Sequence, residues 1–333
     1  MLVKFVTAAL IAYTSLAYGA YVPKTPPLKT PWTDKVDIKN PLPEYPRPQL
    51  VRSQWQSING LWEFTASDQV TTPPIGKTLN ETILVPYPTQ SSISGIMRHE
   101  PYSFYRRHFT VPTTWLLPGK QVILNFGAVT WQATVWINGK EIGKHSGGYD
   151  PFSFDITAHL KRTGNNEIIV GVYSPLDTAG IPLGKQRVTP YQIYYNGATG
   201  IWQTVWLEPT TKGRITQLDT TPDVPGDALN LDVKTSGAAG QIVNAIVLSG
   251  NKTIVGTATG IVGKPLRISI KNARLWSPDD PFLYDLRVTL SGGDTVTGYF
   301  GMRSVGTAFV NGWLRPVLNG RYVVMLAFFQ AGY

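Results

Sequence analysis

The feature that most constrains how this chain folds is a long succession of short segments in which apolar and polar residues alternate, with turn residues between them. Such alternation buries one face of an extended strand and leaves the other in water. The first expected strands are residues 60–64, 104–111, 121–126, 133–137, 140–144, 156–160, 167–173 and 204–207. About eight strands over about 150 residues predict a two-sheet jelly-roll sandwich, here at residues 51–212.

The connection between two of these strands carries the strongest local signal. Asn138 and Gly139 separate two alternating runs, and both residue types tolerate the positive φ that a two-residue hairpin turn requires. We therefore expect a tight hairpin between residues 133–137 and 140–144.

A second series of alternating segments occupies residues 213–306. Its expected strands are residues 215–218, 229–233, 241–248, 266–270 and 284–290. This spacing is typical of an immunoglobulin-like β-sandwich, here without a disulfide because the chain has no cysteine. Composition agrees with an all-β chain, since charged residues make up 15% against a usual value of about 25%, and 32 Gly and 26 Pro supply turns.

The first 50 residues differ from the rest of the chain. Residues 1–19 combine Lys4, an apolar run and small residues before position 20, which is the pattern of a cleaved signal peptide. A retained membrane anchor is the alternative, although a membrane span needs about 20 apolar residues. Residues 20–50 carry eight prolines, which lack the N–H of a strand ladder, and predict an extended arm lying on a domain.

The leader predicts a secreted, extracellular protein. Asn80 and Asn251 each begin an Asn-x-Thr sequon beside turn residues, and we expect both to be glycosylation sites in a eukaryotic secretory route.

Several kinds of chemistry lack the residues that they need. The chain has no Cys and four dispersed His, and it contains neither a glycine-rich phosphate loop nor a nucleophile elbow. Its net charge of +9 comes from scattered basic residues without the aromatic-interleaved stripe of a nucleic-acid binder. We expect no metal, no cofactor, no nucleic-acid partner and, after removal of the leader, no membrane association.

Paired carboxylates are the remaining candidates for hydrolytic chemistry, because glycosidases place two of them roughly 5–10 Å apart. Glu63 alternates with aromatic residues and is predicted to face water, while Asp150 and Asp155 flank a predicted tight loop. Asp177 lies in a long polar loop at residues 174–180, which makes it the strongest candidate for contact with a ligand.

A set of motifs occurs in a distinctive order along both domains. They are residues 85–88 (VPYP), 105–107 (YRR), 136–140 (WINGK), 143–152 (GKHSGGYDPF), 155–157 (DIT), 199–206 (TGIWQTVW), 275–278 (LWSP), 281–284 (PFLY) and 300–303 (FGMR). In sequence and spacing they closely resemble glycoside hydrolase family 2, which includes β-galactosidases, β-glucuronidases and β-mannosidases. The resemblance covers residues 40–333 and implies the family's sugar-binding jelly roll followed by its immunoglobulin-like domain.

In members of this family a TIM barrel follows the immunoglobulin-like domain, so the resemblance implies that residues 307–333 are a truncated entry to that barrel. Residues 318–321 (LNGR) correspond to the approach to its first strand, and the apolar run at 323–329 resembles a buried parallel strand. Both catalytic glutamates of the family lie on the barrel, so no catalytic residue is assigned to this chain.

The same resemblance implies that jelly-roll loops contribute to the rim of the barrel pocket. Asp177 stands in the matching loop, and Glu100, in the loop before Tyr102, is the second candidate substrate-binding residue.

Three functions are compatible with these observations. The first is the amino-terminal part of a secreted family 2 glycoside hydrolase, inactive as this fragment and meeting its carbohydrate substrate through the full-length enzyme. The second is a non-catalytic carbohydrate-binding or interaction protein, which predicts an exposed row of aromatic residues on one sheet face. The third is a structural or anion-binding secreted protein that uses the +9 charge and depends strongly on salt.

Overall fold

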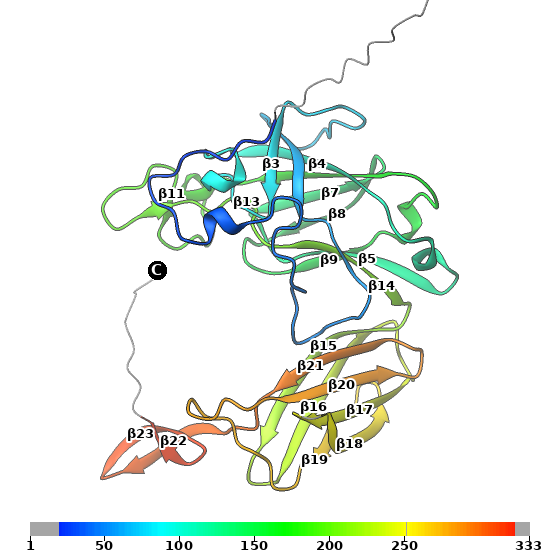
Figure 1. The fold of residues 1–333 in the computed structure, drawn as a ribbon, viewed down its shortest axis with the longest axis vertical. Helices are drawn as coiled ribbons and strands as arrows, with labels where there is room; N and C mark the ends of the chain where they lie inside the picture. Colours follow the sequence, from blue (N-terminus) through cyan, green and yellow to red (C-terminus); the bar gives the residue numbers. More distant parts are fainter. Residues whose placement is uncertain (1–19, 251, 324–333) are drawn as a thin grey trace, which may run out of the picture.

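The computed structural model describes residues 20–250 and 252–323. The predicted leader, the sequon residue Asn251 and residues 324–329 of the apolar run lie outside these ranges. Within them the chain forms two β-sandwiches, which confirms the predicted all-β class (Figure 1). The helical elements of the described residues are short 3-10 helices: η1 (Thr33–Lys35), η2 (Ser92–Ser94), η3 (Thr113–Leu116), η4 (Thr157–His159) and η5 (Leu176–Thr178). None of the helices in this part of the chain could cross a bilayer.

The first sandwich is the jelly roll. Its six-stranded antiparallel sheet has the order β3 (Glu81–Val85), β2 (Gly60–Ala66), β4 (Tyr102–Phe109), β10 (Asn166–Tyr173), β7 (Gln132–Ile137) and β8 (Lys140–Ser146). The facing four-stranded sheet has the order β1 (Gln56–Ser57), β14 (Val205–Thr211), β5 (Lys120–Phe126) and β9 (Phe152–Asp155). Two short pairs complete the domain: β6 (Val129–Thr130) with β13 (Gly200–Ile201), and β11 (Gln186–Arg187) with β12 (Tyr195–Asn196).

Large aromatic residues fill the space between these two sheets. Trp62, Phe64, Tyr105 and Phe126 are all buried, and the rings of Phe64 and Tyr105 meet edge to face at 5.1 Å. Burying each large apolar side chain contributes roughly 1.5–3 kcal/mol, so this cluster supplies much of the stability of the domain.

Strand β10 shows why some segments of the jelly roll lack clear alternation. Ile168 and Val170 face the main core, while Ile169 on the opposite face packs with Phe104 and Trp136 in a second, smaller cluster. A strand buried on both faces is apolar throughout. The sheet is therefore covered on its outer side as well.

The predicted hairpin at Asn138 and Gly139 is confirmed. Their φ angles are +49° and +81°, and the flanking strands β7 and β8 pair from Ile137 and Lys140 outward. Two successive positive φ angles give the turn the twist that matches the strands on either side.

The second sandwich is the immunoglobulin-like domain. One sheet has the order β15 (Arg214–Asp223), β16 (Ala228–Ser236) and β19 (Leu266–Ser269). The other has the order β18 (Thr253–Ile261), β17 (Ile242–Ser249), β20 (Tyr284–Leu290) and β21 (Thr295–Phe300). Strand β20 alternates buried and more accessible residues, and its buried positions enclose a core with Leu229, Val247 and Phe300. Here the period-two pattern of the sequence matches the structure directly.

Three expectations about the jelly roll are wrong. Residues 156–160 contain the 3-10 helix η4 (Thr157–His159) instead of a strand, and strand β9 (Phe152–Asp155) stands where a tight loop was expected between Asp150 and Asp155. Strand β9 pairs with β5 through Phe154 and Leu124, so the pairing partner decides its conformation. Glu63 does not face water, because it forms an ion pair with Arg106 at 2.7 Å and both side chains are largely buried.

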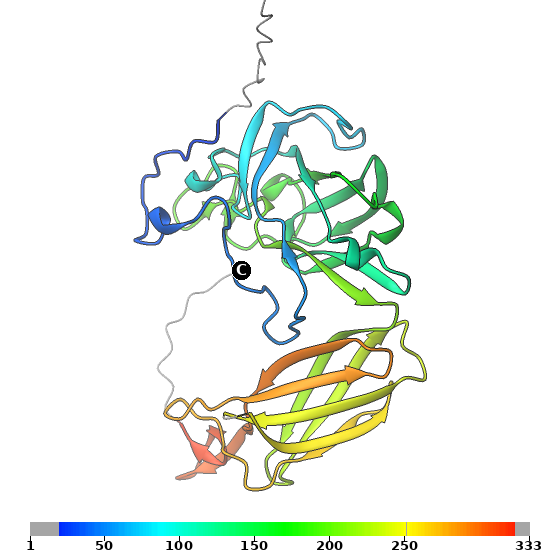
Figure 2. The ribbon, with the colours of Figure 1, turned by 45° about the vertical axis from the view of Figure 1, so that its right-hand side comes forward.

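A buried ion-pair network joins the two sandwiches. Arg52 donates to Glu208 of the jelly roll at 3.1 Å and to Asp294 of the immunoglobulin-like domain at 2.8 Å, and all three side chains are buried. From the arm, Arg47 and Tyr45 also bind the Glu208 carboxylate. Figure 2 shows this part of the arm, in blue, reaching from the first sandwich toward the second.

Residues 305–322 form a separate three-stranded sheet, which we call the C-terminal hairpin. Its strands are β22 (Val305–Val310), β23 (Trp313–Leu318) and β24 (Arg321–Tyr322). Phe309 is 78% exposed and Trp313 is 69% exposed, so this sheet presents large apolar side chains to solvent. Residues 318–321 form the turn between β23 and β24, with positive φ at Asn319 and Gly320.

Candidate functional site

The fold brings together the two loops that carry Asp177 and Glu100. Strands β4 and β10 are antiparallel neighbours, and Tyr102 at the start of β4 pairs with Tyr173 at the end of β10. The loop before β4 and the loop after β10 therefore meet at one edge of the sheet. Two contacts join them: the Ser174 N–H donates to the Pro101 carbonyl at 2.7 Å, and His99 Nε2 lies 2.7 Å from the Ser174 carbonyl.

Asp177 organises its own loop. It lies on η5, and its Oδ1 accepts a hydrogen bond from the Val188 N–H at 2.8 Å. Its Oδ2 is 3.7 Å from Arg187 Nε, and the Arg187 guanidinium lies 4.0 Å from the centre of the Tyr194 ring. A carboxylate and an aromatic face on either side fix the guanidinium in one position. Asp177 is thus a positioning residue for Arg187.

Glu100 has a similar relation to Arg98. Arg98 donates to both oxygens of Glu81, at 2.9 and 2.6 Å, and its Nε donates to Glu100. The hydrogen bonds that Arg98 donates to Glu81, followed by the one that it donates to Glu100, raise the pKa of the guanidinium above its usual value although part of the side chain is buried. Arg98 therefore stays charged and is held between two carboxylates.

Both arginines line a cavity of about 300 Å³ that we call the loop cavity. Its lining consists of Gln90, Met97, Arg98, His99, Leu176, Arg187, Val188, Asn196 and Gly197. Neither Asp177 nor Glu100 belongs to this lining; they act on it through the arginines that they bind. Two guanidinium groups and three carboxylates leave this cluster with a formal charge of −1, so it offers hydrogen-bond donors to hydroxyl groups without attracting an anion.

Several pairs of carboxylates that the fold brings close together are bound by a basic side chain. Four pairs share one basic residue each: Glu63 and Glu167 on Arg106, Glu81 and Glu100 on Arg98, Glu208 and Asp294 on Arg52, and Asp219 and Asp232 on Lys234. A glycosidase needs two carboxyl groups that are free to reach the substrate, whereas both members of each of these pairs are bound to a shared basic residue. We therefore interpret these pairs as structural contacts.

The sequence analysis missed the residues that line the loop cavity. Arg98 and His99 directly precede Glu100, and Arg187 follows Asp177 by ten residues, but neither spacing marks a site by itself. Only the pairing of β4 with β10 brings them together. In the described residues, no group of three or more His, Asp or Glu side chains is arranged to hold a metal ion.

Comparison with known families identifies both domains. Residues 80–207 match the family model for the sugar binding domain of glycosyl hydrolases family 2, and residues 207–303 match a second model of glycosyl hydrolases family 2. The two matches are consecutive and lie in the order that the sequence motifs predicted. The chain belongs to glycoside hydrolase family 2.

Individual relatives agree with this assignment. A β-galactosidase of Thermoanaerobacter pseudethanolicus is 28% identical over 255 residues, covering 70% of this family 2 chain and 33% of the relative. A β-glucuronidase of Paenibacillus borealis is 26% identical over 299 residues, covering 83% and 49%. The chain thus spans a third to a half of the length of these two relatives.

Solved structures share the fold. A β-glucuronidase from Ruminococcus gnavus in complex with uronic isofagomine superposes with a TM-score of 0.70 at 23% identity, covering 86% of this chain and 50% of that one. A β-glucuronidase from Lactobacillus rhamnosus gives a TM-score of 0.66 at 24% identity, covering 83% and 48%.

Proposed function

We propose that this chain supplies the amino-terminal sugar-binding and immunoglobulin-like domains of a secreted family 2 glycoside hydrolase, and that these 333 residues do not hydrolyse glycosides by themselves. The observation that carries the proposal is the consecutive match of both domains to family 2 models. The absence of activity is supported by the four carboxylate pairs described above, each of which is occupied by a shared cation.

The loop cavity is the part of this chain that contacts the carbohydrate substrate. Arg98 and Arg187 are fixed by Glu100 and Asp177, so their free N–H groups can donate to sugar hydroxyls without losing side-chain entropy on binding. In this proposal Asp177 and Glu100 support the substrate contact and take no part in bond cleavage.

Hydrolysis of p-nitrophenyl β-glucuronide, β-galactoside and β-mannoside by the purified 333-residue chain tests this function. We expect no release of p-nitrophenol from protein whose circular dichroism and urea unfolding show a folded state. Turnover would contradict the proposal, and Glu63→Gln and Glu167→Gln variants would then show whether the carboxylates on Arg106 are responsible.

A non-catalytic carbohydrate-binding function is the second candidate, and one observation favours it. Tyr191 is 59% exposed and Tyr195 is 56% exposed, in the same loop that supplies Arg187 to the loop cavity. Such rings can stack on the apolar faces of sugars. Retardation by immobilised polysaccharides in affinity electrophoresis, lost in Tyr191→Ala but kept in the control Trp32→Ala, would support this function over the first.

Secretion forms part of the proposal. It rests on the signal-peptide pattern of residues 1–19 and on Asn80, which is exposed directly before β3 and can carry a glycan without disturbing the core. Expression in a eukaryotic secretory host, followed by amino-terminal sequencing of the protein in the medium, should give a chain that begins at Ala20. Retention of the whole chain in the cells would contradict secretion.

A further inference from the structure

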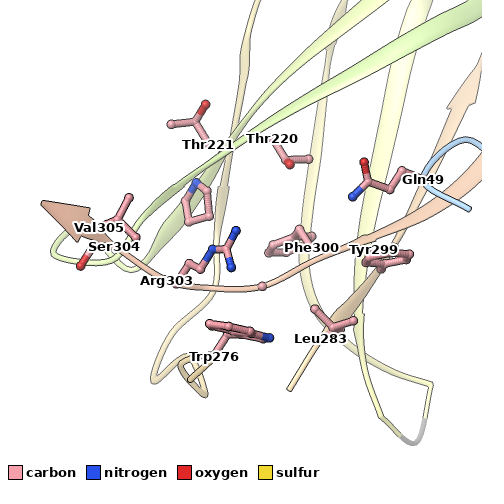
Figure 3. A pocket seen from close by; sticks show the side chains of 12 residues that line it. Gln49, Thr220, Thr221, Trp276, Leu283, Tyr299, Phe300, Arg303, Ser304 and Val305 are labelled. Atoms are coloured by element: carbon pink, nitrogen blue, oxygen red, sulfur yellow. The ribbon is translucent and has the colours of Figure 1, made fainter. Parts of the chain in front are cut away.

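A cavity of about 530 Å³ lies on the immunoglobulin-like domain, and we call it the Arg303 cavity (Figure 3). The arm contributes Gln49 to its wall, and strand β15 contributes Thr220, Thr221 and Pro222. The remaining walls are Trp276, Leu283, Tyr299, Phe300, Gly301, Arg303, Ser304 and Val305. It shares no residue with the loop cavity.

Arg303 is the distinctive residue of this cavity. Its exposed guanidinium lies over the Trp276 ring at 4.8 Å from the ring centre. In the described residues, Arg303 forms no ion pair with a carboxylate. Of the four other arginines stacked on aromatic rings, three pair with a carboxylate: Arg47 with Glu208, Arg187 with Asp177, and Arg274 with Asp280. The fourth, Arg315, donates a hydrogen bond to the hydroxyl group of the Tyr322 ring on which it lies. Arg303 is therefore held in place by an aromatic face while its N–H fork is available to a carboxylate ligand.

The other walls provide the groups that recognise a sugar ring. Figure 3 shows Arg303 above the Trp276 ring, with Thr220 and Thr221 on the opposite side and Tyr299 along the flank. Hydroxyl groups of threonine can both donate to and accept from sugar hydroxyls, and the aromatic rings offer apolar surface to the C–H groups of a pyranose. A concave site with aromatic walls and a few convergent polar groups is the usual form of a small-molecule site.

Hydrogen bonds hold these walls in place before any ligand binds. The Trp276 N–H donates to the Met302 carbonyl at 2.8 Å, and Asn319 Nδ2 donates to the Trp276 carbonyl at 3.0 Å. Val51, which directly follows the arm, is held against β21 by two hydrogen bonds with Thr297, at 2.7 and 3.0 Å. A site whose walls are already ordered loses little entropy on binding.

We propose that the Arg303 cavity binds a pyranose that carries a carboxylate, that is, a hexuronic acid or a hexuronate residue of an acidic saccharide. Arg303 donates two parallel hydrogen bonds to the carboxylate, and the threonines and Gln49 bind the ring hydroxyls. The site is non-catalytic, and it does not depend on the function proposed for the loop cavity.

Ligand-observed NMR titration of the 333-residue chain with D-glucuronate, D-glucose and acetate tests the proposal. D-glucose has the ring without the carboxylate, and acetate has the carboxylate without the ring. We expect D-glucuronate to bind at least tenfold more tightly than either probe. Equal affinity for D-glucose would overturn the role of the carboxylate, and equal affinity for acetate would overturn recognition of a sugar.

Variants then locate the site. Arg303→Gln should weaken D-glucuronate binding at least tenfold, while Arg315→Gln is the matched control. Arg315 is likewise stacked on an aromatic ring, Tyr322, but it lies outside the cavity, so its replacement should leave the affinity unchanged. Equal losses in the two variants, or an unchanged affinity in Arg303→Gln, would overturn the assignment.

Two further variants keep the test independent of folding and of the loop cavity. Thr220→Ala removes a hydroxyl from the opposite wall without touching Arg303 and should weaken D-glucuronate binding severalfold. Asp177→Asn alters the loop cavity and should have no effect on this titration. A loss of D-glucuronate binding in Asp177→Asn, with Thr220→Ala unchanged, would place the ligand in the loop cavity and refute the proposal.

Discussion

Replacing Arg52 by Met should destabilise the junction between the two sandwiches strongly. The Arg52 side chain is 6% exposed and donates four hydrogen bonds: two to Asp294 at 3.1 and 2.8 Å, one to Glu208 at 3.1 Å, and one to the Ile215 carbonyl at 2.7 Å. A methionine fills much of the same volume, so the main loss is the positive charge and its donors.

The loss of stability in Arg52→Met depends on which hydrogen-bond partners Glu208 and Asp294 retain. Glu208 retains Arg47 at 2.7 Å and the Trp206 indole N–H at 2.6 Å, so it remains well satisfied. Asp294 retains the Ile215 N–H at 2.7 Å but loses its guanidinium partner. Leaving a buried charge uncompensated costs about 3–5 kcal/mol, and we expect Arg52→Met to lose that much. The double variant with Asp294→Asn should recover part of the loss, because a buried amide carries no charge.

Urea unfolding followed by tryptophan fluorescence measures this change, since Trp206 belongs to the network. With a typical slope of about 2–3 kcal/mol per M, the midpoint of the affected transition should fall by about 1–2.5 M. Arg47→Met is the control: Glu208 keeps Arg52 there, and the expected loss is about 1 kcal/mol. A loss below about 1 kcal/mol in Arg52→Met, or a double variant less stable than the single one, would refute the reasoning.

Four further predictions concern acidity, glycosylation, solubility and packing. Burial would raise the pKa of Glu208, but Arg47, Tyr45 and Arg52 hold this pKa below its ordinary value of 4.5. The ionised Glu208 carboxylate therefore stabilises the folded state fully above about pH 4.5, and this stabilisation is lost as the pH falls further. Replacing it in Glu208→Gln should make the free energy of unfolding less dependent on pH in the acid range. Asn80→Gln should remove one glycan from the secreted protein. Untreated wild-type and variant proteins whose masses differ only by the amino-acid replacement would contradict this. Deleting residues 305–333 should raise the yield of folded protein, because the C-terminal hairpin exposes apolar side chains, and an unchanged yield would count against that cause. Gly298→Ala should cost about 1–3 kcal/mol in urea unfolding, because a Cβ there would lie 2.5 Å from the Gln49 carbonyl.

The sequence by itself predicted the fold class, the order of the domains and the family. The fold class depends on features that neighbours along the chain determine, and the family was predicted from the resemblance of its ordered motifs to those of family 2. The alternation in residues 284–290 matches strand β20, and the turn at Asn138 and Gly139 has the positive φ angles that those residues permit. A strand at the edge of a sheet was harder to predict: β9 was missed because its pairing with β5, not its own composition, makes it extended.

The tertiary structure decided the electrostatics and the composition of both cavities. Glu63 was expected to face water, yet it meets Arg106 across neighbouring strands, and Arg52 meets Asp294 across 242 positions of sequence. The Arg303 cavity combines the arm with distant strands of the immunoglobulin-like domain. Periodicity and turn residues act over a few bonds and are visible in the sequence, whereas an ion pair or a cavity requires groups that only the packing of sheets brings within a few ångströms.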